Sequence, residues 1–419
     1  MEHDKQKLHD EALKYHEHPT PGKIRIEITK PAETAYDLTL AYSPGVAEPV
    51  KEIADHPEYA YRFTGKGNSV AVISNGTAIL GLGNLGPLAS KPVMEGKALL
   101  FKRFGHIDAI DIEVTHKTVD EFITTVEAIA DTFGGINLED IKAPECFVIE
   151  RELIKRCHVP IFHDDQHGTA IVTAAGILNA VELQGKKLED CRMVCVGAGA
   201  AGVACSNLLI ASGVDRKKLF MVDRHGVIRS DRAQYNNGEK PNFINDAGPK
   251  TLSEACEGAD ILLGVSGPGL IGEAELHKLA DKAVVFACSN PDPEVEPGLV
   301  RKVRPDIIVG TGRSDYPNQI NNVLCFPFLF RGTLDVRATQ INTDMKLAAM
   351  QALRGLAKEP VPEEVVRASM TDHPLKFGPD YVLPKPMDPR LLKVVARAVA
   401  EAAVKSGVAQ IPLPAHYME

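Results

Sequence analysis

The pattern of hydrophobic and polar positions changes twice along the chain and predicts three zones. From Met1 to Ile161, short strand-like runs such as SVAVIS and AIDIEV mix with helical runs such as VDEFITTVEAIADTF, in an irregular order rich in Gly and Pro. From Phe162 to Arg331, apolar runs of β type (RMVCVGAG, KLFMVD, ADILLGVS, AVVFACSNP and DIIVGTG) alternate with helical or Gly-rich connections. This alternation is typical of a doubly wound parallel sheet. Beyond Arg331 the pattern is helical.

These zones predict an α/β protein with a mixed α/β domain over residues 1–161. A Rossmann-like, doubly wound domain with C-terminal helices follows over residues 162–400, and a tail covers residues 401–419. The last helix has readable ends, with Asp388 as N-cap, Pro389 at the first helical position and Gly407 as the stop. One of its faces is apolar, so we expect it to pack back against an earlier domain. That face carries Leu391, Leu392, Val395, Val399 and Ala402.

The composition and charge of the chain restrict its possible binding partners and its cellular compartment. The net charge of -9, from 47 basic and 56 acidic residues, provides no basic field for nucleic acid. The longest apolar stretches are too short and too polar to span a membrane, and the charged N-terminus cannot serve as a signal peptide. The 8 cysteines include no CxxC pair and lie mostly in apolar runs, which is typical of buried reduced thiols. We therefore expect a cytoplasmic protein that binds neither nucleic acid nor membrane.

A glycine-rich turn follows the predicted strand Cys191–Val196 and precedes an apolar helix. Glycine permits a sharp turn and lets the backbone approach a pyrophosphate, which then meets free N–H groups at the helix start. A second strand ends at Asp223 about 20 residues later, where such folds place the group that meets the adenosine ribose. Together these features predict dinucleotide binding. The turn consists of Gly197, Ala198, Gly199, Ala200, Ala201 and Gly202.

A second GxGxxG pattern spans residues 81–86. Pro87 and Pro92 follow it, so we expect no helix to start directly at its last glycine. We interpret this motif as close backbone packing around a substrate loop rather than as the nucleotide turn.

Carboxylates gather after two segments. Glu139 and Asp140 follow a predicted turn, GGIN, while the string HDDQH, with Asp165 as its third residue, follows the apolar strand VPIF and precedes a helix. Exposed neighbouring acids are often merely solvated, but acids at the carboxyl end of a strand lie where open α/β sheets bind ligands. Converging carboxylates favour a hard divalent cation, Mg²⁺ or Mn²⁺. His163 and His167 leave zinc open, although the aspartates and the absence of thiol ligands favour the harder ion.

Six strings make the chain resemble the malic enzymes, in particular the short bacterial type: LAYSPGVAEP, ILGLGNLG, KPVMEGKALLFK, INLEDIKAPECF, IFHDDQHGTA and TGRSDYPNQINNVLCFPF. The resemblance extends from Tyr15 to Val408. It implies metal-dependent oxidative decarboxylation of L-malate to pyruvate and CO₂ with reduction of NADP⁺ or NAD⁺. It also implies an N-terminal domain for substrate and dimerisation, an NAD(P)-binding domain, and a homodimer or higher homo-oligomer.

Site residues follow from the resemblance by position. Tyr42 resembles the family's general acid and Lys97 its general base, while Glu139, Asp140 and Asp165 resemble its metal ligands. Malate and the nicotinamide end would be held by Asn290 with Asn321 or Asn322. Cofactor contacts would come from Thr77, Gly197, Ala198, Gly199, Ala200, Ala201, Asp223, Arg224 and Asn290.

The chemistry requires these residue types. A lysine can take the proton of the malate C2 hydroxyl only if burial or a neighbouring cation lowers its pKa, which we expect for Lys97. A tyrosine hydroxyl suits the final protonation of the enolate carbon. The chain departs from larger family members at Ala78, where they have an arginine that clamps the substrate, so we take Arg313 as the substitute. Many bacterial relatives also continue into a phosphotransacetylase-like region, so the chain is either a short enzyme or the malic part of a longer hybrid.

We expect NADP⁺ to be preferred over NAD⁺. Asp223 alone favours a free ribose hydroxyl, but Arg224 follows it, and Arg229 and Arg232 lie a few residues beyond. Guanidinium groups match phosphate oxygens bidentately. Two alternative functions stay open from the residues: a metal-dependent hydrolase using HDDQH, and a non-catalytic nucleotide sensor.

Overall fold

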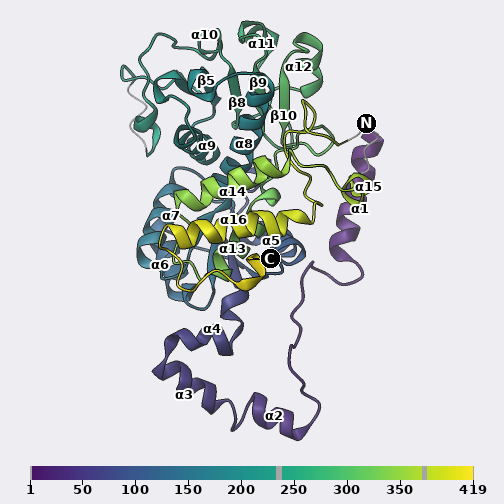
Figure 1. Cartoon of the computed structure of the whole chain (residues 1–419), viewed down its shortest axis with the longest axis vertical. Helices are drawn as coiled ribbons and strands as arrows, with labels where there is room; N and C mark the ends of the chain where they lie inside the picture. The colour runs from purple at the N-terminus through teal and green to yellow at the C-terminus, as the bar shows by residue number, and fades with distance from the viewer. Residues whose placement is uncertain (1, 233–237, 370–374, 419) are drawn as a thin grey trace.

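The protein consists of a body and a protruding N-terminal segment (Figure 1). Its structure is a computed structural model that describes residues 2–232, 238–369 and 375–418. None of the helices in these ranges combines the length and apolar character required to cross a membrane.

The first sheet has four parallel strands in the order β2-β1-β3-β4. They are β1 (Ser69–Ser74), β2 (Asp108–Glu113), β3 (Gly135–Leu138) and β4 (Ile161–His163). In register, Val70 of the central strand β1 lies opposite Ala109 and Gly135. Three helices surround this sheet: α5 (Pro87–Gly105), α6 (Val119–Ala130) and α7 (Glu145–Arg156). Alternate β1 residues point into two separate apolar clusters, because successive side chains of a strand face opposite sides.

The second sheet has the order β10-β9-β8-β5-β6-β7, with β7 antiparallel at the edge and the other strands parallel. Its strands are β5 (Met193–Val196), β6 (Leu219–Asp223), β7 (Gly226–Val227), β8 (Ile261–Gly264), β9 (Val284–Ala287) and β10 (Ile308–Thr311). Its helices are α9 (Ala200–Ala211), α10 (Leu252–Ala255), α11 (Glu273–Lys278) and α12 (Pro297–Val303). Because the chain crosses from β6 over β5 to β8, a ligand crevice is expected at the carboxyl ends of β5 and β8. The predicted α/β class and Rossmann-like sheet are confirmed.

Helix α8 (Asp164–Leu183) joins the two sheets. It begins directly after β4 of the first sheet and packs against α9 of the second. Of its 20 residues, 15 are buried, because the helix is covered on all sides rather than along one stripe.

The C-terminal helices pack back on the body, as predicted. They are α13 (Phe326–Asp335), α14 (Thr343–Leu356), α15 (Glu363–Ala368) and α16 (Arg390–Lys405), and α13 contacts α5 while α14 contacts α8. Helix α16 follows Pro389 as its N-cap, one residue later than predicted, and Gly407 has the positive φ of 75° that suits a residue beyond a helix end. The predicted division into domains stays a prediction. Its boundary between residues 161 and 162 lies inside β4, and that between residues 400 and 401 lies inside α16.

Two local predictions were wrong. GGIN was expected to be a turn, yet Gly135–Leu138 forms β3, because Ile136 and Leu138 are buried and Gly135 leaves room for the Phe330 ring. Helix α5 starts at Pro87, directly after Gly86, although a proline was expected to prevent this. Proline is tolerated at the first helical position, because its missing N–H would have no partner in the helix.

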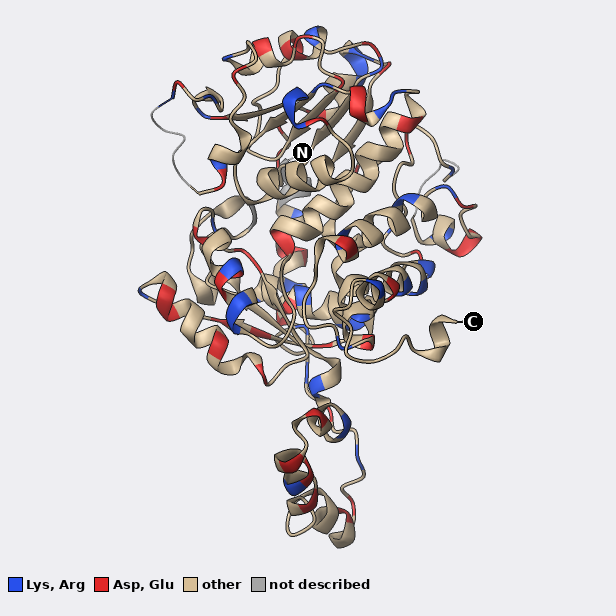
Figure 2. Cartoon of the chain, turned by 60° about the vertical axis from the view of Figure 1, so that its left-hand side comes forward, with Lys and Arg blue, Asp and Glu red and all other residues tan. Residues whose placement is uncertain are grey.

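The N-terminal segment carries α1 (Glu2–Glu17), α2 (Ala35–Ala41), α3 (Ala47–Asp55) and α4 (Ala60–Phe63). We call residues 24–58, which contain α2 and α3, the arm. It is attached at one end where the Lys23 N–H donates to Glu95, and at the other where Arg337 lies over the Tyr61 ring. In Figure 1 and in the rotated view of Figure 2 the arm lies apart from the body. In the described part of the chain, no residue of the arm is buried, and no hydrogen bond or ion pair links the arm to the body.

Candidate active site

A cluster of acids lies where β3 and β4 end at the same edge of the first sheet. Glu139 and Asp140 follow β3, while Asp164 and Asp165 form the first turn of α8 directly after β4. Carboxylates at the N-terminus of a helix are stabilised by its free N–H groups and its dipole. Lys97 reaches the same place from α5.

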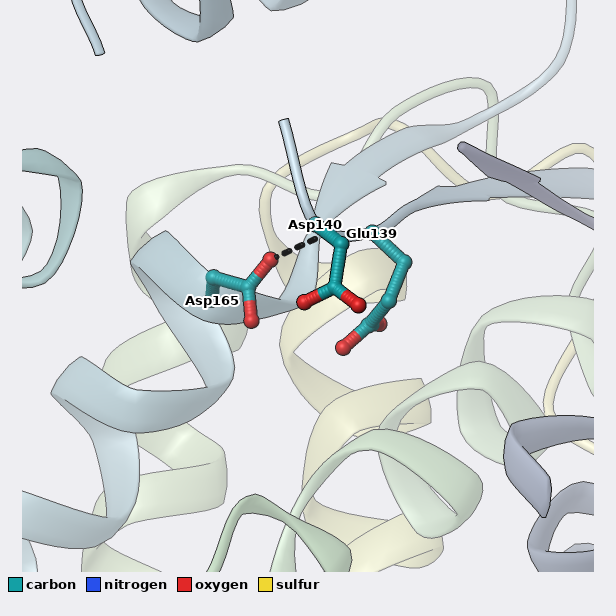
Figure 3. Close-up of side chains that lie close together, drawn as sticks. All are labelled: Glu139, Asp140 and Asp165. Atoms are coloured by element: carbon teal, nitrogen blue, oxygen red, sulfur yellow. Dashed lines mark hydrogen bonds between the residues drawn. The ribbon is translucent and has the colours of Figure 1, made fainter. Parts of the chain in front are cut away.

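The three predicted metal ligands meet in space. Glu139, Asp140 and Asp165 each offer an oxygen, and these three atoms lie within 4.8 Å of one another. Figure 3 shows the three carboxyl groups converging, with the Asp140 N–H donating to Asp165 Oδ2 at 2.7 Å. Asp140 has a φ of 54°, a backbone conformation that is uncommon for residues other than glycine and is concentrated at functional sites.

Lys97 is 7% exposed and forms two ion pairs. Its Nζ lies 2.7 Å from Asp164 Oδ2 and 2.9 Å from Glu139 Oε1. Burial lowers the pKa of Lys97, but the negative charges of Asp164, Glu139 and Asp165 outweigh burial and raise the pKa above its ordinary value. The expected lowering of the pKa of Lys97 is therefore not found among these side chains.

The pKa values of two acids in the cluster are raised as well. Burial raises the pKa of Glu139 and that of Asp164 to about 7, although Lys97 acts to lower both. In the described chain, Asp164 Oδ1 and Asn137 Oδ1 are buried without a hydrogen-bond partner. Three carboxyl groups, those of Asp164, Glu139 and Asp165, thus act on one ammonium, and oxygen acceptors remain without a donor. An oxygen-rich site with excess negative charge fits Mg²⁺ or Mn²⁺.

Asp164 was missed as a site residue. It is fully buried, and its carboxylate approaches Gly168 so closely that a Cβ there would lie 1.8 Å from Asp164 Oδ1. The adjacent pair of aspartates was the available signal, but sequence alone did not show which of the two faces Lys97.

The two asparagines at the 3₁₀ turn before α13 have different surroundings. The side chain of Asn321 caps this turn by accepting from the Val323 N–H at 3.0 Å. The side chain of Asn322 lies next to Gly168 and close enough to Asp164 to act to lower the pKa of that carboxyl. Asn322 is therefore the one of the pair that the fold brings to the acid cluster.

His163 and His167 do not join the acids as a group of metal ligands. His167 Nε2 lies 2.8 Å from Glu150 Oε1, and His163 is fully buried, with Nδ1 3.8 Å from Asp165. Burial lowers the pKa of His163 to about 4, which keeps the ring neutral. His167 is thus a polar group that is already paired with Glu150.

The glycine-rich turn has the expected geometry. Gly197 directly follows β5 and has a φ of 122°, and a Cβ there would lie 2.5 Å from the carbonyl oxygen of Val265, which directly follows β8. A Cβ at Gly202 would lie 1.9 Å from the Gly197 carbonyl oxygen. Only glycine fits these two positions. Helix α9 starts at Ala200, so its free N–H groups are available for an anion.

Asp223 is the last residue of β6, and its carboxylate already accepts hydrogen bonds within the chain. Its two carboxylate oxygens accept from Arg232 at 2.7 Å and Lys240 at 2.8 Å, and the His225 N–H donates to it at 2.8 Å. Burial acts to raise the pKa of Asp223, but these hydrogen bonds outweigh it and lower the pKa. The charge that would repel a phosphate is therefore neutralised locally.

The three arginines after β6 have different roles. Arg232 holds Asp223 and the loop carbonyls of Gly226 and Val227, whereas Arg229 bonds to Asp231 and to two more carbonyls. Arg224 is exposed, and the bond that the structure gives its side chain is to the neighbouring His225 ring at 3.1 Å.

The second glycine motif packs closely against the loop that follows β9, in agreement with its interpretation as a site of close backbone packing. A Cβ at Gly81 would lie 2.6 Å from the Asn290 carbonyl oxygen, which brings a loop of the first sheet beside a loop of the second. Thr77 lies on the first-sheet side, where its hydroxyl donates to Asn75 at 2.7 Å and accepts from the Lys142 N–H at 3.0 Å. These contacts leave the roles of Thr77 and Asn290 as predictions.

The fold does not bring two other predicted residues to the cluster. Tyr42 is the C-cap of α2 in the arm and is 76% exposed, and Figure 1 shows α2 well apart from α5, the helix that carries Lys97. Arg313 is held by two acids near it, Asp315 at 2.6 Å and Glu296 at 3.6 Å. A substrate carboxylate would have to compete with both acids for this guanidinium.

Comparison with known proteins identifies the family. The profile described as "Malic enzyme, N-terminal domain" matches residues 21–119 and 113–154, and "Malic enzyme, NAD binding domain" matches residues 166–368. A Halomonas elongata protein named NADP-dependent malic enzyme is 62% identical over 97% of this chain and 96% of its own length. A Rhizobium meliloti protein named NAD-dependent malic enzyme is 50% identical, and the chain spans only 53% of that protein. A solved malic enzyme from Pyrococcus horikoshii superposes with a TM-score of 0.89 at 42% identity, over 98% of this chain and 94% of the other. The resemblance in sequence is thus confirmed, and the chain belongs to the malic enzyme family.

Proposed function

We propose that the protein oxidises and decarboxylates L-malate to pyruvate and CO₂ while reducing NADP⁺. The observation that carries this proposal is the contact of Lys97 with Asp164 and Glu139 beside the three converging carboxylates. A base next to a cation-binding set of oxygens suits an α-hydroxy acid, because the hydroxyl proton and the carboxylate both require a partner.

Lys97 takes the proton from the malate C2 hydroxyl as hydride moves from C2 to the nicotinamide ring. For this step its ammonium must first lose a proton, which the surrounding carboxylates oppose. If Glu139, Asp140 and Asp165 held a divalent cation, their negative charge would be offset and the pKa of Lys97 would fall. The resulting β-keto acid loses CO₂ by cleavage of its C3–C4 bond, which leaves an enolate. Tyr42 then supplies a proton to the enolate carbon to give pyruvate.

Glu139, Asp140 and Asp165 are the residues that would hold Mg²⁺ or Mn²⁺. Bound there, the ion would act as a Lewis acid that stabilises negative charge on the substrate oxygens during decarboxylation. Asp164 is proposed as the positioning group for Lys97, because its carboxylate lies 2.7 Å from the lysine Nζ and is fully buried.

NADP⁺ is the proposed cofactor, with NAD⁺ as the alternative. The glycine-rich turn would bind the pyrophosphate, and Arg224 would reach the 2′-phosphate. The clamp of Arg232 and Lys240 on Asp223 supports this choice, since a neutralised carboxylate does not repel the phosphate.

A homodimer is the proposed assembly, with each arm lying against the partner. The arm exposes a series of apolar side chains that the body of the same chain leaves uncovered: Ile24, Ile26, Ile28, Tyr36, Leu38, Leu40, Tyr42, Val46 and Val50. Exposed apolar groups of this extent mark an interaction surface. Such an arm would carry Tyr42 to the Lys97 site of the partner, which accounts for its distance from the site in its own chain. The cytoplasm is the proposed compartment, since all 8 cysteines are free thiols.

The test is a spectrophotometric assay of the whole chain with malate, Mn²⁺ and either NADP⁺ or NAD⁺, combined with pyruvate detection. We expect absorbance at the reduced nicotinamide band and equimolar pyruvate, with faster turnover on NADP⁺. Cofactor binding without turnover would instead indicate a nucleotide sensor. Metal-dependent hydrolysis without any nicotinamide change would indicate a hydrolase.

A further inference from the structure

A cavity of about 540 Å³ lies between α7, α8, α9 and α14, apart from the acid cluster. Neither Lys97, the three converging carboxylates nor the glycine-rich turn lines it. Its volume is in the range of small-molecule sites, which is roughly 300–1,000 Å³. The proposed reaction leaves this cavity without a role.

One part of the cavity wall is apolar. Phe147 of α7, Ala170 of α8, and Val203 and Leu208 of α9 line it, and the last three are buried. The rim carries Ala211, which is exposed and therefore leaves a route for a ligand from solvent. This wall suits the apolar body of an organic molecule.

The rest of the wall carries an ammonium without a close partner. Lys346 of α14 lines the cavity, and among the described residues its ammonium forms no hydrogen bond and no ion pair within 4.0 Å. Burial lowers the pKa of Lys346, although the charge of Glu150 opposes this. The ammonium lies close enough to Glu150 and His167 to act on the pKa of both groups, but these two are already paired with each other. A partly desolvated cation that lacks a partner favours an anionic ligand.

A second polar group points to the same chemistry. Gln166 lines the cavity, is 3% exposed, and its side-chain nitrogen has no hydrogen-bond partner among the described residues. An amide N–H and an ammonium are both donors, so together they suit a carboxylate rather than a cation or an amine.

We propose that this cavity is a binding site for an amphipathic monocarboxylate, whose carboxylate pairs with Lys346 while its hydrocarbon body covers Phe147, Val203 and Leu208. The site is separate from the one proposed for malate and does not depend on that function.

Octanoate is the probe, and octan-1-ol is its uncharged match. Titration calorimetry on the whole chain, without malate or cofactor, is expected to show saturable binding of octanoate, one per chain, and binding of octan-1-ol at least about tenfold weaker, the usual loss with one charge-assisted bond. No saturable octanoate binding, or equal binding of the alcohol, would overturn the proposal.

Two independent variants locate the site. Lys346→Met keeps the length of the side chain but removes its charge, and Ala211→Phe places a ring at the exposed rim. Both are expected to weaken octanoate binding by about tenfold or more. Lys155→Met is the control, because Lys155 also lines the cavity but is exposed and already paired with Glu152 at 2.8 Å. Wild-type affinity in both Lys346→Met and Ala211→Phe would place the octanoate elsewhere and reject the site; circular dichroism establishes that each variant is folded.

Discussion

The acid cluster and the arm are built in opposite ways, although the family resemblance assigns both to one reaction. Around the cluster, Glu139, Asp140 and Asp164 are at most 3% exposed and are fixed by elements of the same chain. In the arm, Ile26 is 95% exposed and no described residue is buried. The residues of the acid cluster are therefore positioned by the fold of a single chain, whereas the role of Tyr42 depends on the surface that covers the arm.

The first prediction concerns the removal of a proposed metal ligand from the acid cluster. Asp165→Asn should lower malate turnover by at least about a hundredfold, because one of three converging carboxylates is lost. Mn²⁺ binding, measured by electron paramagnetic resonance without substrate, should weaken, whereas NADP⁺ binding by calorimetry should not. Undiminished Mn²⁺ affinity in this variant would contradict the metal assignment.

The second prediction links the acid cluster to the arm. Lys97→Ala should lose hydride transfer, and Tyr42→Phe should lose mainly the final protonation, seen as slower deuterium incorporation into pyruvate; each loss should be about a hundredfold or more. If arms are exchanged, an equimolar mixture of the two variants regains about a quarter of wild-type activity, because half of the dimers are mixed and each has one intact site.

The control for that mixture is each variant incubated alone under the same conditions. A mixture no more active than the mean of its components would place Tyr42 and Lys97 of one chain in the same site, or show that Tyr42 has no role.

The third prediction disrupts the proposed contact between the arm and the partner subunit. Ile26→Asp combined with Ile28→Asp should shift the protein from dimer to monomer in sedimentation velocity, because two exposed apolar side chains become charged. Met387→Asp is the matched control, since Met387 is also exposed, at 52%, but lies outside the arm. An unchanged dimer in the double variant would show that the arm does not form the interface.

The fourth prediction concerns cofactor binding by residues in the body of the chain. Arg224→Ala should raise KM for NADP⁺ by about tenfold, the loss of one or two charge-assisted hydrogen bonds, with little change for NAD⁺. Lys240→Gln should act in the same direction, because it leaves Asp223 with one cation fewer. Lys217→Ala removes an exposed cation elsewhere and should change neither constant. Equal weakening of both cofactors by Arg224→Ala would show that this arginine does not bind the 2′-phosphate.

The smallest expected effect is on thermal stability, and it is tested at one acid in the body and one acid in the arm. Hydrogen bonds from Arg304 lower the pKa of Asp306 to about 2, so this group stabilises the body above its unfolded pKa of about 4, and the stabilisation is lost as pH falls toward 2. Asp306→Asn should therefore lower Tm at pH 6 by about 2 °C and reduce the difference at pH 3. Asp37→Asn removes the capping acid of α2 and should leave the main transition unchanged, because the arm contributes no buried residue. A similar change in Tm from both variants would show that the arm melts together with the body.

The sequence predicted those features that depend on local pattern and on parallel strands. The strand, glycine turn and helix around Gly197 follow from apolar runs and from the need for a close approach. The meeting of Glu139 with Asp165 follows because parallel strands end at one edge of a sheet.

Other features depend on contacts between residues far apart in the chain. Gly135 belongs to a strand because the Phe330 ring and Pro160 pack against it. The raised pKa of Lys97 and the clamp of Lys240 on Asp223 arise from groups 67 and 17 positions away. The exposure of Tyr42 has a different cause, since no spacing within the chain shows that a segment leaves its own body.

Helix α8 has a mechanical consequence. Its 20 residues span about 30 Å and form one stiff rod from the acid cluster to the second sheet, where the helix contacts β9. A small tilt of the nucleotide-binding sheet would therefore act through this rod as a lever and displace Asp164 and Asp165, which form its tip. Closure of the sheet on the cofactor and adjustment of the acids next to Lys97 would then be a single movement.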